Sequence, residues 1–161
     1  MPDMLVKLYD LEDPAGEVEA LRATGIDCRR AESFERSAVL EFVGLHFPHW
    51  VDEATAGFGG VRPNVFVASE RGRVLGFACY NVTRPDYFGP TGVEEAQRGR
   101  GIGKALLLQC LEALRAEGYA YAIIGGVGPA RFYERAVGAT IIDGSETGIY
   151  GGMLRPLGGQ R

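Results

Sequence analysis

The fold of this chain is decided by the stretch Gln97-Arg98-Gly99-Arg100-Gly101-Ile102-Gly103-Lys104. Three glycines alternate there with bulkier residues, directly before a leucine-rich segment and after an aromatic, glycine-interrupted strand candidate, Tyr87 to Val93. The first turn of a helix has unpaired N–H groups and a partial positive charge, so it attracts anions. Glycines let the backbone approach a phosphate without a Cβ clash. The stretch therefore predicts a phosphate-binding loop between a strand and a helix.

Spacing separates three kinds of phosphate loop. A nucleoside-triphosphate loop requires a glycine where Arg98 stands and a hydroxyl where Ala105 stands, so this interpretation fails twice. The dinucleotide fingerprint G-x-G-x-x-G fails because Lys104 or Leu106 occupies the place of its last glycine. The pattern Arg-x-x-Gly-x-Gly fits residues 98–103. On the loop alone, a plain glycine turn that starts a helix remains an open alternative.

The whole sequence limits the classes of protein to consider. A length of 161 residues with 46% hydrophobic residues predicts one globular domain, and the net charge of −4 without a basic block argues against nucleic acid as a partner. No apolar run is long enough to span a membrane, and the N-terminus lacks a signal-peptide pattern. Cys28, Cys79 and Cys110 are far apart, so we expect reduced thiols, a cytoplasmic protein and no metal site.

Hydrophobic patterning predicts an alternation of strands and helices. In the first half we expect a strand, an acidic loop with a helical turn, a capped helix, an irregular aromatic segment and a β-hairpin. These elements are assigned to Met4–Leu8, Asp10–Gly25, a helix from Ser33 to Val43, Gly44–Gly60, and the strands Asn64–Ser69 and Val74–Tyr80. Gly89, Pro90 and Gly92 interrupt the next strand, which predicts a bulge or a close approach of a ligand to the backbone.

The second half continues the alternation. A helix from Ile102 to Glu117 places leucines on one face and ends at Gly118, a residue type that favours helix termination. Further elements are expected at Tyr119–Ile124 (a buried strand), Ala130–Val137 (a short helix), and Thr140–Ile142 with Ile149–Leu154 (a final strand pair). This order predicts a mixed α/β domain with helices packed on one sheet.

The Arg-x-x-Gly-x-Gly loop between this strand and this helix resembles the pyrophosphate loop of the GNAT superfamily of acetyl-CoA-dependent N-acetyltransferases. The resemblance implies an α/β (α+β mixed) fold. Its central mixed sheet would have six to seven strands, and it would be splayed at the strands before and after the loop helix. It implies one acyltransferase domain over residues 1–161. Residues 1–60 would form the first strand, helices and acceptor-side loops, residues 61–143 the sheet and acyl-CoA core, and residues 144–161 a C-terminal strand and tail.

The resemblance also assigns a binding site for the co-substrate acetyl-CoA. The pantetheine arm would lie in the cleft beside the bulged strand, and the pyrophosphate would lie on the loop amides, with Arg98 and Arg100 as charge partners. The residues implied in binding are Val93, Arg98, Gly99, Arg100, Gly101, Ile102, Gly103, Lys104, Phe132 and Tyr133.

A second stretch, Gly126 to Ala139, resembles the family signature Asn-x-x-Ala-x-x-Phe-Tyr-x-x-x-Gly-Phe. Phe132 and Tyr133 match the signature. Gly126 stands where the family usually has Asn, one extra residue precedes Gly138, and Ala139 replaces an aromatic residue. At Gly126 the chain therefore lacks the side chain with which the family contacts the cofactor arm.

By the same resemblance, Tyr133 is expected to act as the general acid that protonates the leaving thiolate. The backbone N–H of Val93 is expected to stabilise the tetrahedral oxyanion. The amine would attack the thioester directly in a ternary complex. The general base is not identified: Asp86, His46 and His49 are candidates beside a water chain, whereas Glu94 and Glu95 fit better as solvated carboxylates. The aromatic segment His46–Phe58 falls where this fold usually shapes its acceptor site.

Alternatives remain for both activity and partners. A non-catalytic acyl-CoA-binding regulatory module would keep the loop and lose the chemistry, and a nucleotide-phosphate binder is a weaker alternative. The acceptor is expected to be the primary amine of a small molecule or a peptide. Neither a nucleic acid nor a membrane is expected as a partner, and the chain is expected to be a monomer or homodimer.

Overall fold

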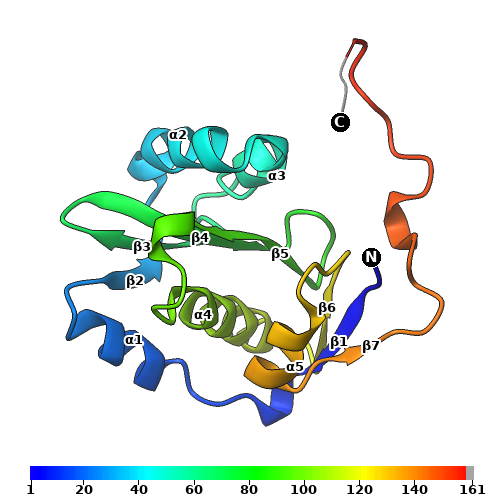
Figure 1. The fold of residues 1–161 in the computed structure, drawn as a ribbon, viewed down its shortest axis with the longest axis horizontal. Helices are drawn as coiled ribbons and strands as arrows, with labels where there is room; N and C mark the ends of the chain where they lie inside the picture. Colours follow the sequence, from blue (N-terminus) through cyan, green and yellow to red (C-terminus); the bar gives the residue numbers. More distant parts are fainter. Residues whose placement is uncertain (159–161) are drawn as a thin grey trace.

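The computed structural model describes residues 1–158 and shows one mixed β-sheet covered on both faces by helices (Figure 1). The strand order across the sheet is β2-β3-β4-β5-β6-β1-β7. All neighbouring strands are antiparallel except β5 and β6, which are parallel. The strands are β1 (Met4–Lys7), β2 (Asp27–Arg30), β3 (Val65–Glu70), β4 (Arg73–Tyr80), β5 (Tyr87–Val93), β6 (Tyr121–Ile124) and β7 (Thr140–Ile141).

The helices form two layers, one on each face of the sheet (Figure 1). One layer holds α2 and α3, and the other holds α1, α4 and α5. The α-helices are α1 (Ala15–Arg22), α2 (Arg36–His46), α3 (Val51–Ala56), α4 (Ile102–Ala116) and α5 (Ala130–Val137). Short 3₁₀ segments are η1 (Leu8–Asp10), η2 (Ser33–Glu35), η3 (Pro48–Trp50), η4 (Glu95–Gln97) and η5 (Gly148–Tyr150).

Two apolar clusters hold these layers to the sheet. The larger contains four leucines of α4 (Leu106, Leu107, Leu111 and Leu114), and the smaller lies between α2, α3 and the opposite face of the sheet around Phe77. α4 begins after Gly101, whose φ of 86° is left-handed, and Gly118 with a φ of 103° follows its end. Both turns require a backbone that glycine adopts without strain. The glycine loop is thus fixed between the sheet and a fully anchored helix.

The sheet opens between β5 and β6. These strands pair only at Tyr87↔Ile123 and Phe88↔Ile124, although β5 continues to Val93. Along β4, the register shifts between Ala78 and Tyr80, where β5 carries one extra residue. The bulge includes Gly89, which has a φ of 111°, and the cis peptide bond between Gly89 and Pro90. The expected bulge and the expected splay are therefore both present, and the fold prediction is confirmed.

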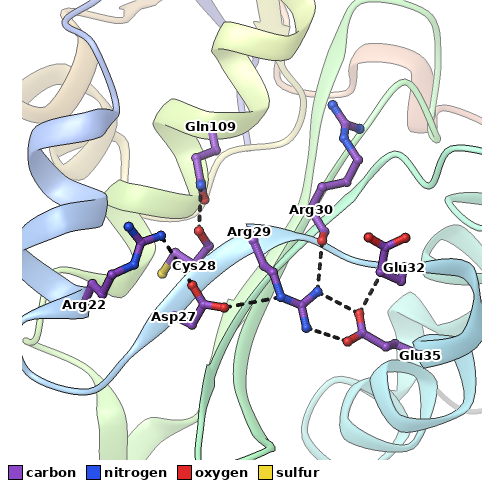
Figure 2. Close-up of polar contacts among 8 residues, drawn as sticks. All are labelled: Arg22, Asp27, Cys28, Arg29, Arg30, Glu32, Glu35 and Gln109. Atoms are coloured by element: carbon purple, nitrogen blue, oxygen red, sulfur yellow. Dashed lines mark hydrogen bonds and ion pairs between the residues drawn. The ribbon is translucent and has the colours of Figure 1, made fainter.

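β2 is an edge strand that the sequence analysis missed. The Arg29 guanidinium lies between two carboxylates: its Nε is 3.3 Å from Asp27, and its Nη1 donates to Glu35 at 2.9 Å (Figure 2). Gln109 of α4 donates to the carbonyl of Cys28 at 3.0 Å (Figure 2). Paired charges on an exposed edge also discourage strand addition by another chain.

Two other expectations need correction. The segment Gly44–Gly60 is not wholly irregular, because it contains η3 and α3. The expected strand at Ile149–Leu154 is wrong: η5 and turns occupy this segment, and β7 pairs with β1 instead of with a later strand. Glycines at 148, 151 and 152 favour turns here. The tail prediction for residues 144–161 extends to residues 159–161, which lie outside the described part.

No helix within residues 1–158 is long and apolar enough to cross a membrane. The three cysteines are buried, free thiols.

Candidate functional site

A cavity of about 730 Å³ occupies the opening between β5 and β6. Its walls come from the bulged part of β5, the glycine loop and first turn of α4, the segment after β6, α5, and the aromatic residues before α3. Of the residues expected to bind acetyl-CoA, the cavity brings together Val93, Arg98, Gly99, Gly101, Ile102, Gly103, Lys104, Phe132 and Tyr133. Arg100 is the exception, because it is not part of the cavity wall.

The loop presents backbone N–H groups to this cavity. The N–H of Ala105 donates to the carbonyl of Gly101 at 3.2 Å, as the first hydrogen bond along the chain in α4. The N–H groups of Ile102, Gly103 and Lys104 therefore lie in the first turn, where an α-helix provides no acceptor of its own. Their alignment with the helix dipole makes this end of the cavity suitable for an anion.

The basic side chains around the loop are already engaged. The Arg98 Nε donates to the carbonyl of Val93 at 3.2 Å, and Arg100 donates to Gln97 at 2.6 Å. The Lys104 ammonium lies 2.8 Å from Glu12 and 3.0 Å from Glu17, and these hydrogen bonds raise its pKa. Lys104 and Arg100 are thus engaged by side chains, whereas no carboxylate within residues 1–158 pairs with Arg98, whose charge stays available beside the loop amides.

The backbone of Val93 points away from β4. The N–H of Glu94 donates to the carbonyl of Leu75 at 2.9 Å, so the neighbouring pair Gly76↔Val93 is of the non-hydrogen-bonded kind. The N–H and carbonyl of Val93 are then directed toward the side where β6 no longer pairs with β5. The side chain of Arg98 covers this carbonyl, and the N–H remains a donor at the cavity wall.

Tyr133 is a buried part of the cavity wall. Its ring packs against Phe88 of β5 with centroids 6.2 Å apart and against Phe132 with centroids 5.1 Å apart. The residue is buried, and burial raises the pKa of its phenol to about 12. Among the described residues its hydroxyl has no hydrogen-bond partner, whereas the ring position is fixed on both sides. Phe132 also faces the loop, because a Cβ atom on Gly103 would lie 3.7 Å from its ring.

The cavity has an aromatic mouth on the sheet face that α2 and α3 cover. Phe47 and Trp50 line it and stack with centroids 5.4 Å apart. The expected acceptor-side segment therefore does reach the cavity. Neither His46 nor His49 is part of the wall, and His46 packs beside Phe42 instead.

The carboxylate candidates for a base also lie outside the cavity wall. Asp86 has a left-handed backbone with a φ of 67°, and its Oδ1 is buried without a hydrogen-bond partner in the described residues. Burial raises the pKa of this carboxyl to about 6. Glu94 pairs with Arg73 at 2.9 Å, and neither it nor Glu95 lines the cavity. None of the five side chains considered as a base lines the cavity wall.

Sequence reasoning missed the residues that hold the segment after β6. The carboxylate of the buried residue Asp3 accepts a hydrogen bond from the N–H of Gly126 at 2.8 Å. The backbone N–H of Asp3 donates to the hydroxyl of Ser145 at 2.8 Å. Tyr150 packs beside the same segment, since a Cβ on Gly125 would lie 3.3 Å from its hydroxyl. These contacts join distant parts of the chain, so no local pattern signals them.

The geometry defines an α/β domain whose splayed sheet holds one cavity between a glycine loop and a buried tyrosine. The family model described as "Acetyltransferase (GNAT) family" matches residues 28–139. The chain belongs to this family, and acetyl transfer is the general reaction class that its family and fold support. No curated protein matches the chain.

Solved structures share the fold at low sequence identity. One is the GCN5-related glucosamine N-acetyltransferase region of a fungal multi-domain GH3 β-N-acetylglucosaminidase, with 20% identity over 88% of this chain and 19% of that chain (TM-score 0.72). Another is a GCN5-related N-acetyltransferase from Sphaerobacter thermophilus, with 21% identity over 88% of this chain and 48% of that chain (TM-score 0.64). A GNAT-family acetyltransferase from Colwellia psychrerythraea has 15% identity over 87% of this chain and 52% of that chain (TM-score 0.59). The chain thus spans about half or less of these three solved chains.

Proposed function

We propose that this chain is an N-acetyltransferase that transfers the acetyl group of acetyl-CoA to a primary amine by direct attack in a ternary complex. The observation that carries the proposal is the continuity of one cavity from the loop amides, past the unpaired edge of β5, to Tyr133 and the aromatic mouth. Acetyl-CoA is a co-substrate in this proposal, and the residues present fit it. The first turn of α4 suits the pyrophosphate, and the gap beside Val93 suits an extended arm with amide groups.

The backbone of Val93 supports the proposed oxyanion contact. Its N–H is directed toward the cavity because β4 uses the neighbouring residue Glu94 for its ladder bond. A fixed N–H donor stabilises the charge that develops on the carbonyl oxygen during attack, without reorganisation of the protein. The carbonyl of Val93 accepts a hydrogen bond from Arg98. The pantetheine arm of bound acetyl-CoA would compete with that side chain for this carbonyl.

Tyr133 is the proposed general acid. Its raised pKa keeps the phenol protonated throughout the neutral pH range, so the proton is available when the carbon–sulfur bond breaks. The same pKa makes it a weak acid, and the tyrosinate formed must recover a proton from the ammonium that the attacking amine becomes. The described side chains offer no carboxylate or imidazole at the cavity wall for the first deprotonation. We therefore assign that step to water.

The aromatic mouth is the proposed acceptor entrance. Phe47 and Trp50 line the cavity from the cluster of α2 and α3, away from the α4 cluster beside the loop, which leaves this part of the cavity for the acceptor. Within residues 1–158 no group of three His, Cys, Asp or Glu side chains is placed to hold a metal ion. The proposed steps use only backbone amides, a phenol and water.

A thiol-release assay tests the proposal. The full chain is incubated with acetyl-CoA and a panel of small and peptide amines, and free CoA is measured with a thiol reagent. Acceptor-dependent release above the rate without an amine is the expected result. Calorimetric binding of acetyl-CoA without release for every acceptor would favour a non-catalytic acyl-CoA-binding module instead. Protection from thermal unfolding by ATP but not by acetyl-CoA would contradict both.

A further inference from the structure

A second hollow adjoins the cavity where α4 begins beside α5. It measures about 500 Å³ and is lined by Lys104, Arg131, Phe132, Arg135 and Ala136. Lys104 and Phe132 also line the larger cavity, so the two spaces meet at these side chains. Three of the five lining residues are cations, although the chain as a whole has a net charge of −4. The hollow is therefore a local concentration of positive charge beside the proposed pyrophosphate site.

The three cations of this hollow differ in whether a carboxylate of the same chain pairs with them. Lys104 pairs with Glu12 and Glu17. No carboxylate within residues 1–158 forms an ion pair with Arg131 or Arg135, and both side chains belong to exposed residues of α5. The open charge of the hollow consequently belongs to these two arginines.

The local structure of α5 does not favour these two charges. Arg131 and Arg135 are four residues apart, where like charges on a helix repel each other. Arg131 also lies in the first turn of α5, where the helix dipole disfavours a cation. An anion bound between the two guanidinium groups relieves both effects.

From this arrangement we propose that Arg131 and Arg135 bind the 3′-phosphate of the co-substrate's adenosine, with Phe132 packing beside its ribose or base. This inference rests on the proposed use of acetyl-CoA. In acetyl-CoA the phosphorylated ribose follows the pyrophosphate on the side away from the thioester. With the thioester at Tyr133 and the pyrophosphate on the loop, the adjoining hollow is the next space available. A phosphate monoester matches guanidinium donors in both charge and hydrogen-bond geometry.

The test compares acetyl-CoA with acetyl-dephospho-CoA, which lacks only the 3′-phosphate. Binding of both is measured calorimetrically for the wild-type chain and for Arg131→Gln/Arg135→Gln. We expect the wild-type chain to bind acetyl-CoA roughly tenfold more tightly than acetyl-dephospho-CoA, which corresponds to a binding free energy of about 1.4 kcal/mol. The double variant should bind both molecules about equally, because its affinity for acetyl-CoA falls while its affinity for acetyl-dephospho-CoA stays unchanged. More salt lowers the wild-type preference because the arginines are exposed.

A matched control removes the same charge elsewhere. Arg36 begins α2, which covers the opposite face of the sheet (Figure 1). Arg62 is an exposed residue of the segment before β3. The variant Arg36→Gln/Arg62→Gln should keep the wild-type preference for acetyl-CoA. If it loses the preference equally, overall charge rather than the hollow is responsible, and the assignment is wrong.

Two further outcomes overturn the inference in distinguishable ways. Equal binding of the two co-substrates by the wild-type chain refutes the 3′-phosphate site alone and leaves the proposed function intact. Absence of binding by either molecule refutes the proposed function together with this inference. Because the wild-type comparison needs no substitution, poor folding of a variant does not prevent the decision.

Discussion

Gly92 and Phe47 occupy the same small space at the mouth of the cavity: a Cβ atom on Gly92 would lie 2.5 Å from the Phe47 ring. The ring crosses the backbone of β5 and stacks on Trp50. The aromatic wall can approach the strand this closely only because residue 92 has no side chain. The glycine that interrupts the strand pattern thus has a packing reason.

Replacing this glycine should destabilise the protein. The added methyl of Gly92→Ala displaces Phe47, and overpacking of this kind costs about 1–3 kcal/mol. Urea unfolding measures the difference. Gly16→Ala serves as the control, because its Cβ would meet nothing within 4 Å and alanine suits a helical residue better than glycine does. An unfolding midpoint of Gly92→Ala equal to that of the wild type would contradict the close packing.

A left-handed glycine of the loop should matter for the co-substrate as well as for stability. Gly101 has a φ of 86° with open space around its Cβ position, so Gly101→Ala introduces strain of about 1–2 kcal/mol without a clash. We expect weaker acetyl-CoA binding, because relief of the strain moves the N–H groups of the first turn of α4. Gly72→Ala is matched in conformation, with a φ of 76°, and lies in the β3–β4 turn. It should lose similar stability but keep its affinity.

Removing the phenol of Tyr133 should reduce turnover and leave binding nearly unchanged. General acid catalysis contributes about 10²–10⁴-fold, so Tyr133→Phe is expected to lower kcat by at least about 10²-fold, with little change in acetyl-CoA affinity. Steady-state kinetics and calorimetry separate the two effects. Tyr119→Phe, outside the cavity wall, is the control. Retention of wild-type turnover by Tyr133→Phe across the pH range would refute the acid role.

The partly buried, charged carboxylate of Asp86 should lower the free energy of unfolding at neutral pH. Its pKa in the folded chain is raised to about 6 by burial, so the folded state holds this proton more tightly than the unfolded chain. The stabilisation from the bound proton is complete below pH about 4 and is lost as the pH rises through about 6. Asp86→Asn, which tolerates the left-handed backbone, should stabilise the protein at pH 7 by about 1 kcal/mol after allowance for solvent screening.

Thermal unfolding at a series of pH values checks this expectation. The advantage of Asp86→Asn should shrink toward pH 4, where the native carboxyl is also neutral. An advantage of the same size at both ends of the range would show that charge burial is not its cause.

Local patterns were sufficient wherever an element begins and ends with its own signals. Pro129 and Gly138 bracket α5, and the bounds expected for that helix agree with the structure. The loop and its helix were predicted for the same reason, because positive-φ glycines and a leucine face lie within one short stretch.

The remaining elements depend on partners that are distant in sequence. β2 contains Asp27, Arg29 and Arg30 and forms an edge by pairing with β3, so its sequence lacks the apolar alternation of a strand. The contact between Asp3 and Gly126 is equally invisible locally. The prediction of a strand at Ile149–Leu154 was wrong because it followed the apolar residues there, whereas the glycines around Tyr150 favour turns. Side-chain roles at the cavity followed from family resemblance, and their test requires the variants above.

The position of β1 between β6 and β7 has a consequence for biosynthesis. The first strand leaves the ribosome long before its neighbours, and the hydrogen bond from Gly126 to Asp3 spans 123 positions. Until β6 is synthesised, β1, with its apolar residues Met4 and Val6, has no neighbouring strand to pair with. We therefore expect this wall of the cavity to form late in synthesis, because β1 completes its pairing only after β6 and β7 have been made.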